Sequence, residues 1–158
     1  MDIYENIKSA GVELLKVQDP SGPYSFGVPF GDNLLYTSGS NCRKDGVPIF
    51  TGKVGKDVTL EEAQRCAEQC IINMLSNLHA TFGNLNRIKR VVKILGFVAC
   101  TEEFYEQPKV LNSASELLIR IFGENGKAAR SAVGAPALPG NIPVEIEILF
   151  ELKNEYEK

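Results

Sequence analysis

Residues 87–100, RIKRVVKILGFVAC, are the most informative segment of the chain. Most of its residues from position 91 onward are apolar and many are β-branched, which favours a strand over a surface helix. Alternation predicts two faces, one with Val91, Leu95, Phe97 and Ala99 and the other with Val92, Ile94, Gly96, Val98 and Cys100. Both faces are apolar, so both must be covered, as in a strand inside a sheet.

An amphipathic helix is predicted on each side of this strand. Apolar residues recur every three or four positions across residues 60–82. Thr59 and Glu62 form a capping box before them, and Gly83 is the expected stop. Residues 107–122 show the same period after the strand. Each helix therefore has one apolar face to bury.

Further strands are predicted towards both ends of the chain. Residues 144–152 alternate apolar side chains with glutamates, which indicates a strand with one buried and one acidic face. Residues 129–135 are interpreted as a strand joined to it by a loop rich in turn residues, so we expect a hairpin. Residues 24–30 and 34–38 are interpreted as the strands of a second hairpin.

These elements describe one α+β domain over residues 1–158, in which residues 1–12 form a helical N-terminal extension. Two helices can cover only one face of a sheet of this size. The strand at residues 87–100 is apolar on both faces, so its second face needs another cover. A second copy of the chain is the simplest one. We therefore expect a homo-oligomer.

The composition narrows the classes of function. Seventeen Lys and Arg against 20 Asp and Glu give a net charge of −3, which lacks the basic surface of a general nucleic-acid binder. No apolar run reaches the ~18 residues of a membrane span, and Asp2 and Glu5 stand where a signal peptide would be basic and then apolar. We expect a cytoplasmic protein with neither a membrane nor a nucleic-acid partner.

The scarce metal-binding residues narrow the chemistry. His79 is the single histidine, which excludes a zinc site of several imidazoles and a catalytic histidine pair. It falls near the end of a predicted helix, where an exposed structural role is expected. The four cysteines, Cys42, Cys66, Cys70 and Cys100, lack the paired spacing of a zinc site and are interpreted as reduced core thiols. The sequence predicts no metal and no cofactor.

A cation and two carboxylates are the strongest candidates for chemistry. If Arg130 shares the acidic face of residues 144–152, its guanidinium and Glu145 or Glu147 line one patch on the side of the sheet away from the helices. Arginine binds a carboxylate or phosphate through two nitrogens, and a glutamate can hold a water as a general base. The alternative is a cross-strand salt bridge between Arg130 and one glutamate, which spacing alone favours.

Several motifs occur in a characteristic order: Ser21-Gly-Pro-Tyr24, Tyr36-Thr-Ser-Gly39, Val110-Leu-Asn112, Arg130-Ser131, Leu138-Pro139 and Val144-Glu-Ile-Glu147. In order and approximate spacing they resemble the RidA (YjgF) family of reactive-intermediate deaminases. The most specific part runs from Arg130 through Leu138-Pro139 to Glu145. The resemblance implies a chorismate-mutase-like fold, in which a mixed sheet carries two helices on one face and packs its other face in a homotrimer.

The resemblance also implies an activity, the hydrolysis of 2-imino or enamino acids to 2-oxo acids and ammonia in a cleft between subunits. It implies that Arg130 binds the carboxylate of the substrate and that Glu145 positions the water. Tyr24, Ser38 and Asn112 fall where the family has pocket-lining groups. Each also has an ordinary structural role open to it: a core position, a strand end and a helix surface, respectively.

Two departures from the family pattern point to a divergent branch. Family deaminases often have a cysteine two residues after the arginine, where this chain has Ala132, whose backbone N–H can still contact a ligand. The N-terminal extension and a longer segment between Gly39 and Gly83 would reshape the rim of the cleft. Two other functions stay open: a sensor that binds small carboxylates without turnover, and an endoribonuclease, against which the charge and the lone histidine count.

Overall fold

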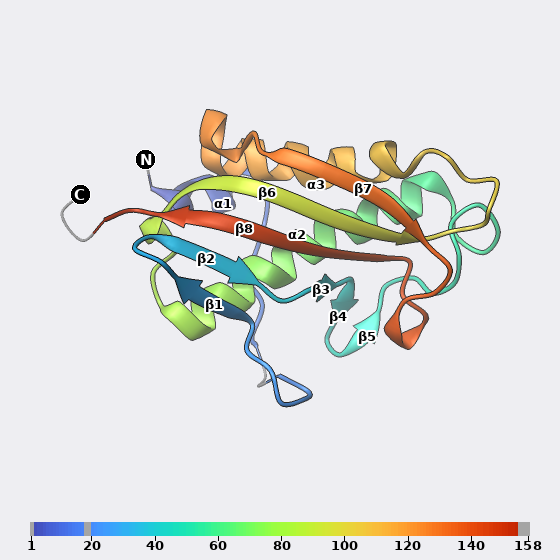
Figure 1. Ribbon diagram of the computed structural model, residues 1–158, viewed down its shortest axis with the longest axis horizontal. Helices are drawn as coiled ribbons and strands as arrows, with labels where there is room; N and C mark the ends of the chain where they lie inside the picture. Colours follow the sequence, from blue (N-terminus) through green and yellow to red (C-terminus); the bar gives the residue numbers. More distant parts are fainter. Residues whose placement is uncertain (1, 18–19, 155–158) are drawn as a thin grey trace.

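A six-stranded mixed sheet lies against two long helices in the computed structural model, which describes residues 2–17 and 20–154 (Figure 1). Along the sheet the strands are ordered β1 (Gly27–Phe30), β2 (Leu34–Thr37), β8 (Val144–Leu152), β6 (Ile88–Ala99) and β7 (Ala129–Ala135), and β3 (Ser40–Asn41) also pairs with β8. All these pairs are antiparallel except β6 with β7. A separate ribbon consists of β4 (Arg43–Lys44) and β5 (Val47–Pro48).

The two long helices begin and end as the sequence predicts. Helix α2 (Leu60–Phe82) starts at a capping box, in which Thr59 and Glu62 each accept a hydrogen bond from the other's backbone N–H, and ends at Gly83. Helix α3 (Gln107–Phe122) follows β6. The N-terminal extension contains the short helix α1 (Ile3–Ser9). Within the described ranges, no helix combines the length and the apolar character needed to cross a membrane.

Short 3-10 helices complete the chain at η1 (Leu85–Arg87), η2 (Gly123–Gly126) and η3 (Pro139–Asn141). The apolar core lies between the helices and the sheet, with Ile71, Leu118 and Phe150 among its fully buried side chains. At Gly96 of β6 an added Cβ would lie 2.8 Å from Leu111 Cδ2, so this glycine lets α3 approach the sheet closely. The expected α+β class with both long helices on one face is confirmed.

The prediction of which side chains share a face of β6 is wrong at the start of the strand. Val91 and Ile94 are both buried although they are three positions apart, and the register with β8 shifts between Val91 and Lys93. This irregularity places Val91 on the buried face, so Val91 and Val92 each lie on the face opposite to the one predicted. From Ile94 through Val98 the predicted alternation holds.

The predicted hairpin between β7 and β8 is also wrong. Strand β7 pairs with the other side of β6, in parallel register, so β6 separates it from β8. The turn-rich residues 136–143 carry the chain past the end of β6 instead of folding it back on β7 (Figure 1). Turn residues predict a loop, but they do not specify which strand is the next partner.

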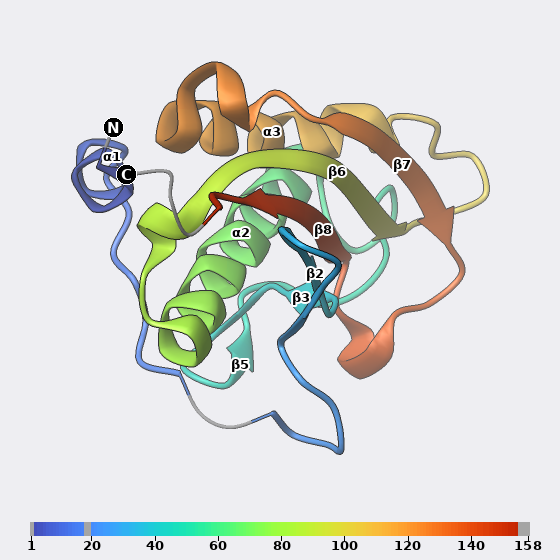
Figure 2. The ribbon, with the colours of Figure 1, turned by 60° about the vertical axis from the view of Figure 1, so that its left-hand side comes forward.

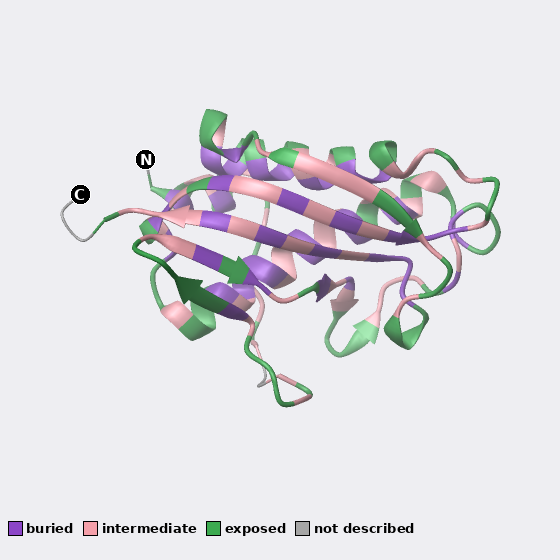
Figure 3. Cartoon of the chain, in the orientation of Figure 1, coloured by how far each residue is buried: buried purple, intermediate pink, exposed green. Residues whose placement is uncertain are grey.

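The face of the sheet away from α2 and α3 lacks a full cover. Along β6 and β8, buried residues alternate with residues of intermediate exposure (Figure 3). Tyr36 on β2 and Val133 on β7 are 45% and 41% exposed. Leu95 and Phe97 of β6 lie between them with intermediate exposure. The chain therefore presents a partly apolar sheet face to its surroundings, as the sequence predicts.

Candidate functional site

Arg130 lies on β7 with its side chain against α3. Its Nη1 donates hydrogen bonds to Asn112 Oδ1 at 3.1 Å and to Ser115 Oγ at 3.0 Å. None of the ion pairs in the described part of the chain includes Arg130. The guanidinium is therefore held by two neutral oxygens, and its charge is not neutralised by a carboxylate.

The strand register explains why Arg130 does not meet the glutamates. Arg130 is in line with Ile94 of β6 and Ile148 of β8, which face the helices. Glu145 and Glu147 alternate with buried residues of β8 and so point to the other face. The expected patch combining Arg130 with these glutamates in one chain is therefore wrong, and so is the alternative salt bridge.

Two other predicted residues lie with Arg130. Asn112 of α3 accepts its hydrogen bond, and Ala132 is in line with Gly96 on the same face of the sheet. Ser115 was not predicted, although its position one helical turn after Asn112 is a usable signal because residues three apart share a helix face. We refer to Arg130, Asn112, Ser115 and Ala132 as the Arg130 cluster.

Glu145 occupies β8 between Phe97 of β6 and Asn41 of β3. Within the described chain its carboxylate has neither a hydrogen-bond donor nor a cation as partner. Burial, and next the nearby charge of Glu147, raise the pKa of Glu145. A carboxylate with a raised pKa is a stronger base than an ordinary surface glutamate.

Gly39 lies directly against this carboxylate. A Cβ at position 39 would be 2.8 Å from the carboxyl carbon of Glu145, so only glycine leaves room for the side chain in this place. The chain passes here between β2 and β3, where its register against β8 shifts by one residue. Thr37 bridges the shift, because its Oγ1 accepts a hydrogen bond from the backbone N–H of Ile148 at 2.9 Å.

A groove of about 550 Å³ borders the same turn. Its walls come from β3, β4, α2 and the segment before β1, and they include the predicted residues Tyr24 and Ser38 as well as Gly39. Tyr24 is 49% exposed, so it does not serve as a core residue. Ser38 donates a hydrogen bond to the carbonyl of Ser25 at 2.6 Å, which ties the turn to the segment before β1. Glu145 lies outside the groove, but Gly39 borders both.

The Arg130 cluster and the groove lie on different sides of the molecule. Figure 2 shows β6 and β8 between β7, which carries Arg130, and the short strands β2 and β3. The structure thus brings Tyr24, Ser38 and Glu145 to one region and Arg130, Asn112 and Ala132 to another. No group of three or more His, Cys, Asp or Glu side chains in the described ranges is arranged to hold a metal ion.

His79 has the expected structural surroundings. It is exposed in the last turn of α2, and its Nδ1 lies 3.0 Å from the hydroxyl of Tyr4. The same hydroxyl donates to the carbonyl of Gly83 and accepts from the backbone N–H of Leu85. These contacts attach the N-terminal extension to the end of α2, which is a structural role.

The four cysteines are free and buried, as predicted. Contact with Cys42 and burial raise the pKa of the Cys66 thiol, and burial raises that of Cys70. The Sγ of Cys70 donates to the carbonyl of Val144 at 3.5 Å. These thiols pack α2 against β3 and β8, behind the turn at Gly39.

Comparison with known proteins identifies the family. Residues 5–152 match the family model described as "YjgF/chorismate mutase-like, putative endoribonuclease". The chain is 37% identical over 150 residues to protein TCP17 of Trypanosoma cruzi, covering 94% of this chain and 93% of that protein.

Two solved structures are similar over nearly the whole chain. Atu1372 of Agrobacterium tumefaciens, a protein of unknown function, is 41% identical with a TM-score of 0.86, covering 96% of this chain and 92% of that one. A protein of Shewanella oneidensis, described as a "putative endoribonuclease", is 30% identical with a TM-score of 0.89, covering 96% and 100%. The chain therefore belongs to the YjgF/chorismate mutase-like family, and its fold is the one that the sequence motifs imply.

Proposed function

We propose that this protein hydrolyses 2-imino and enamino acids to 2-oxo acids and ammonia, in a cleft formed where the Arg130 cluster of one copy meets Glu145 and the groove of a neighbouring copy. The observation that carries the proposal is the state of Arg130. It is a fixed guanidinium without a carboxylate partner among the described residues. Such a group is suited to bind the carboxylate of a ligand.

Arg130 would anchor the substrate. Asn112 and Ser115 accept hydrogen bonds from Nη1 alone, so among the described residues Nε and Nη2 are left for the oxygens of a substrate carboxylate. Because both partners are neutral, they fix the orientation of the guanidinium without cancelling its charge. A substrate held in one orientation presents its imine carbon at a constant position, which lowers the entropic part of the barrier.

Glu145 would activate the water. The water oxygen adds to the imine carbon while the Glu145 carboxylate takes one of its protons and the imine nitrogen takes up a proton from solvent, which gives a carbinolamine. Glu145 then passes its proton to the amino group, and the C–N bond breaks so that ammonia leaves. The remaining hydroxyl releases its proton to solvent as the carbonyl of the 2-oxo acid forms. An imine carbon is already electrophilic, so a bound carboxylate, a placed water and a proton acceptor are sufficient for this chemistry. The raised pKa of Glu145 supports its role as the acceptor.

The proposal requires at least two copies of the chain. Within one copy, Arg130 and Glu145 point to opposite faces of the sheet, and β6 lies between their strands. The incompletely covered sheet face supplies a surface on which copies could associate. We therefore include the homotrimer implied by the sequence motifs in the proposal, with each cleft built from two neighbours.

The test is ammonia release from 2-iminopropanoate and 2-iminobutanoate, generated in place by an amino-acid oxidase. Arg130→Ala should lower kcat/KM by roughly 100-fold, because a buried charge pair with the substrate is lost. Arg120→Ala is the matched control, since Arg120 is an exposed arginine of α3 that pairs with Glu68. It should behave as wild type, and sedimentation should show the same assembly for all three proteins.

Other outcomes would change the assignment. An Arg130→Ala protein as fast as wild type would remove the anchor from the proposal. A wild-type protein that does not accelerate ammonia release, but is stabilised against heat by 2-oxo acids, would be a carboxylate sensor without turnover.

A further inference from the structure

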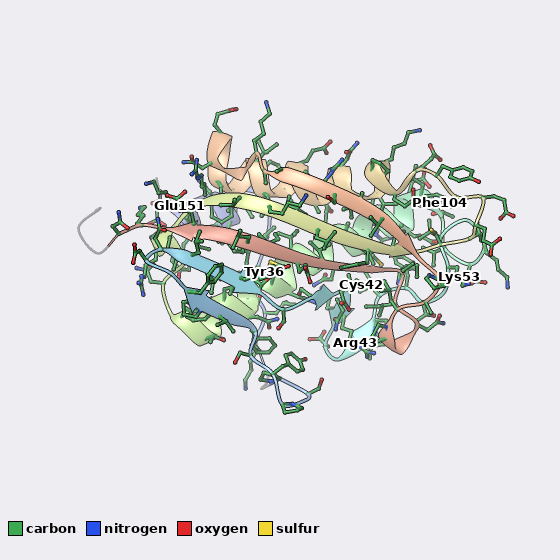
Figure 4. The ribbon with its side chains drawn as sticks, viewed as in Figure 1. Tyr36, Cys42, Arg43, Lys53, Phe104 and Glu151 are labelled. Atoms are coloured by element: carbon green, nitrogen blue, oxygen red, sulfur yellow. The ribbon has the colours of Figure 1, made fainter. Side chains whose placement is uncertain are left out.

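A second guanidinium lies in the groove and has no part in the proposed reaction. Arg43 belongs to β4, two residues after Asn41, which pairs with Glu145. Figure 4 shows Arg43 beside the β4–β5 ribbon, near the loop that joins β7 to β8. Like Arg130, Arg43 takes part in none of the ion pairs between described residues. Its charge is therefore open to a ligand.

The position of Arg43 is fixed from two sides. Its Nη1 donates to the carbonyl of Gly46 at 3.0 Å, and a Cβ at Gly140 would overlap its Nη2, so the guanidinium lies directly over that glycine. Asn73 of α2 holds the backbone, because its Nδ2 donates to the carbonyls of Asn41 at 2.8 Å and of Arg43 at 2.7 Å. The guanidinium is thus held in place before any ligand arrives.

Other groups in the groove agree with an anionic ligand. Ser40 lines it, is 5% exposed, and its buried hydroxyl has no hydrogen-bond partner in the described structure. Lys16 contributes a second cation to the lining. Among the described residues of the lining, Asp45 is the one carboxylate, and it forms no ion pair with Arg43. A buried hydroxyl without a partner is costly unless a ligand or water engages it.

The groove leads from the turn at Gly39 towards Arg43. Gly39 and Asn41 both line it, and both are neighbours of Glu145, the proposed base. Arg43 follows Asn41 by two positions, so their Cα atoms are at most about 7 Å apart. A substrate whose imine carbon lies at Glu145 could therefore extend its side chain along the groove to Arg43.

We propose that Arg43 is a specificity residue for a second acidic group and that the protein prefers dicarboxylic 2-imino acids over neutral ones. This inference rests on the proposed function. Arg130 of the neighbouring copy binds the carboxylate beside the imine, and Arg43 binds the carboxylate at the far end of the side chain. A neutral side chain would leave the guanidinium and the Ser40 hydroxyl without partners, which lowers the stability of the complex.

The experiment compares 2-iminoglutarate with 2-iminopentanoate, which has the same number of carbons and no second carboxylate. The ratio of their kcat/KM values should favour 2-iminoglutarate by roughly ten- to a hundredfold in the wild type, the range expected for a charged hydrogen bond. In Arg43→Met the ratio should fall to near one. Lys44→Met is the matched control, because Lys44 is the next residue, is exposed and does not line the groove. It should keep the wild-type ratio.

The result that overturns the inference is a wild-type ratio near one, or a preference that survives Arg43→Met. If the wild type releases ammonia from neither substrate, the proposed function fails, and calorimetry with 2-oxoglutarate and 2-oxopentanoate decides the inference separately. Tighter binding of 2-oxoglutarate that is lost in Arg43→Met would sustain the acidic subsite. Equal binding, or no binding, would refute it.

Discussion

The surroundings of Arg130 and of Glu145 differ in a consistent way. Arg130 is a cation held by two neutral oxygens of α3, whereas Glu145 is a carboxylate that has no donor among the described residues and lies beside a second carboxylate and a glycine. The two charges could neutralise each other, but the register of the sheet keeps them on opposite faces. Within the described part of one copy, neither charge is neutralised by an opposite charge, as expected if each serves a ligand or a neighbouring copy.

The largest effect is expected when the two residues are supplied on different copies. Arg130→Ala and Glu145→Gln proteins should each retain about one hundredth of the wild-type rate or less when tested alone. Mixed in equal amounts after dissociation and reassembly, they should recover about one quarter of the wild-type rate, because one cleft in four would join an intact Arg130 to an intact Glu145. Ammonia release from 2-iminobutanoate measures the recovery.

The control for this mixture is the same pair of variants combined without dissociation, which should stay at the low rate of the single variants. Absence of recovery in well-assembled mixtures would mean that Arg130 and Glu145 do not act together across copies. The proposed cleft between copies would then be wrong, although the observed positions of both residues within one chain would be unaffected.

A second change moves the carboxylate without removing it. Gly39→Ala would place a Cβ in the space occupied by the Glu145 side chain and displace its carboxylate. We expect roughly a tenfold or greater loss of kcat/KM, since small misplacements of a reacting group are costly. Introduced into the Glu145→Gln protein, the same change should have little further effect on the rate. A further tenfold loss of kcat/KM in the Glu145→Gln protein would show that Gly39→Ala lowers the rate independently of the Glu145 carboxylate.

The smallest expected effect is a shift in pH dependence. Glu145 must be ionised to act as a base, so the rate should fall as the pH falls through its raised pKa. Glu147→Gln removes one of the two causes of the raised pKa, so the acid limb of kcat/KM should move to lower pH while the plateau changes by less than about twofold. Rate profiles at constant ionic strength would measure this.

Glu151→Gln is the matched control for the pH experiment. Glu151 lies on the same strand, but Arg90 and Lys89 pair with it, which lowers its own pKa. Its removal should leave the acid limb of the rate in place. An equal shift in both variants would indicate a general effect of net charge instead of the contact between Glu147 and Glu145.

Local rules predicted the elements well. The capping box and Gly83 give the ends of α2, and the period of two gives β8, because these signals depend on neighbours in the sequence. The partner of β7 could not be predicted, since a turn-rich loop can either fold back or carry the chain past a strand. The register shift at Val91 could not be predicted either, because it depends on pairing with a strand more than fifty residues away.

The same division applies to the candidate site. Motif order predicted Arg130 and Glu145 as candidates, but the face on which each lies follows from the register of β6, β7 and β8. Arg43 carried no signal in the sequence. Its place in the groove depends on Asn73 of α2 and on Gly140 of the loop after β7, which come together only in the folded chain.

The reactivity of the buried cysteines behind the groove would report which parts of the protein open. Cys42 lies between β3 and β4, whereas Cys66 and Cys70 belong to α2, and all three are fully buried. A thiol reagent can reach Cys42, and Cys66 in contact with it, when the short segment carrying β3 and β4 separates from α2. It reaches Cys70, whose Sγ donates to the carbonyl of Val144 on β8, only when α2 leaves the sheet. The order of labelling therefore distinguishes local breathing beside the groove from global unfolding, without an added probe.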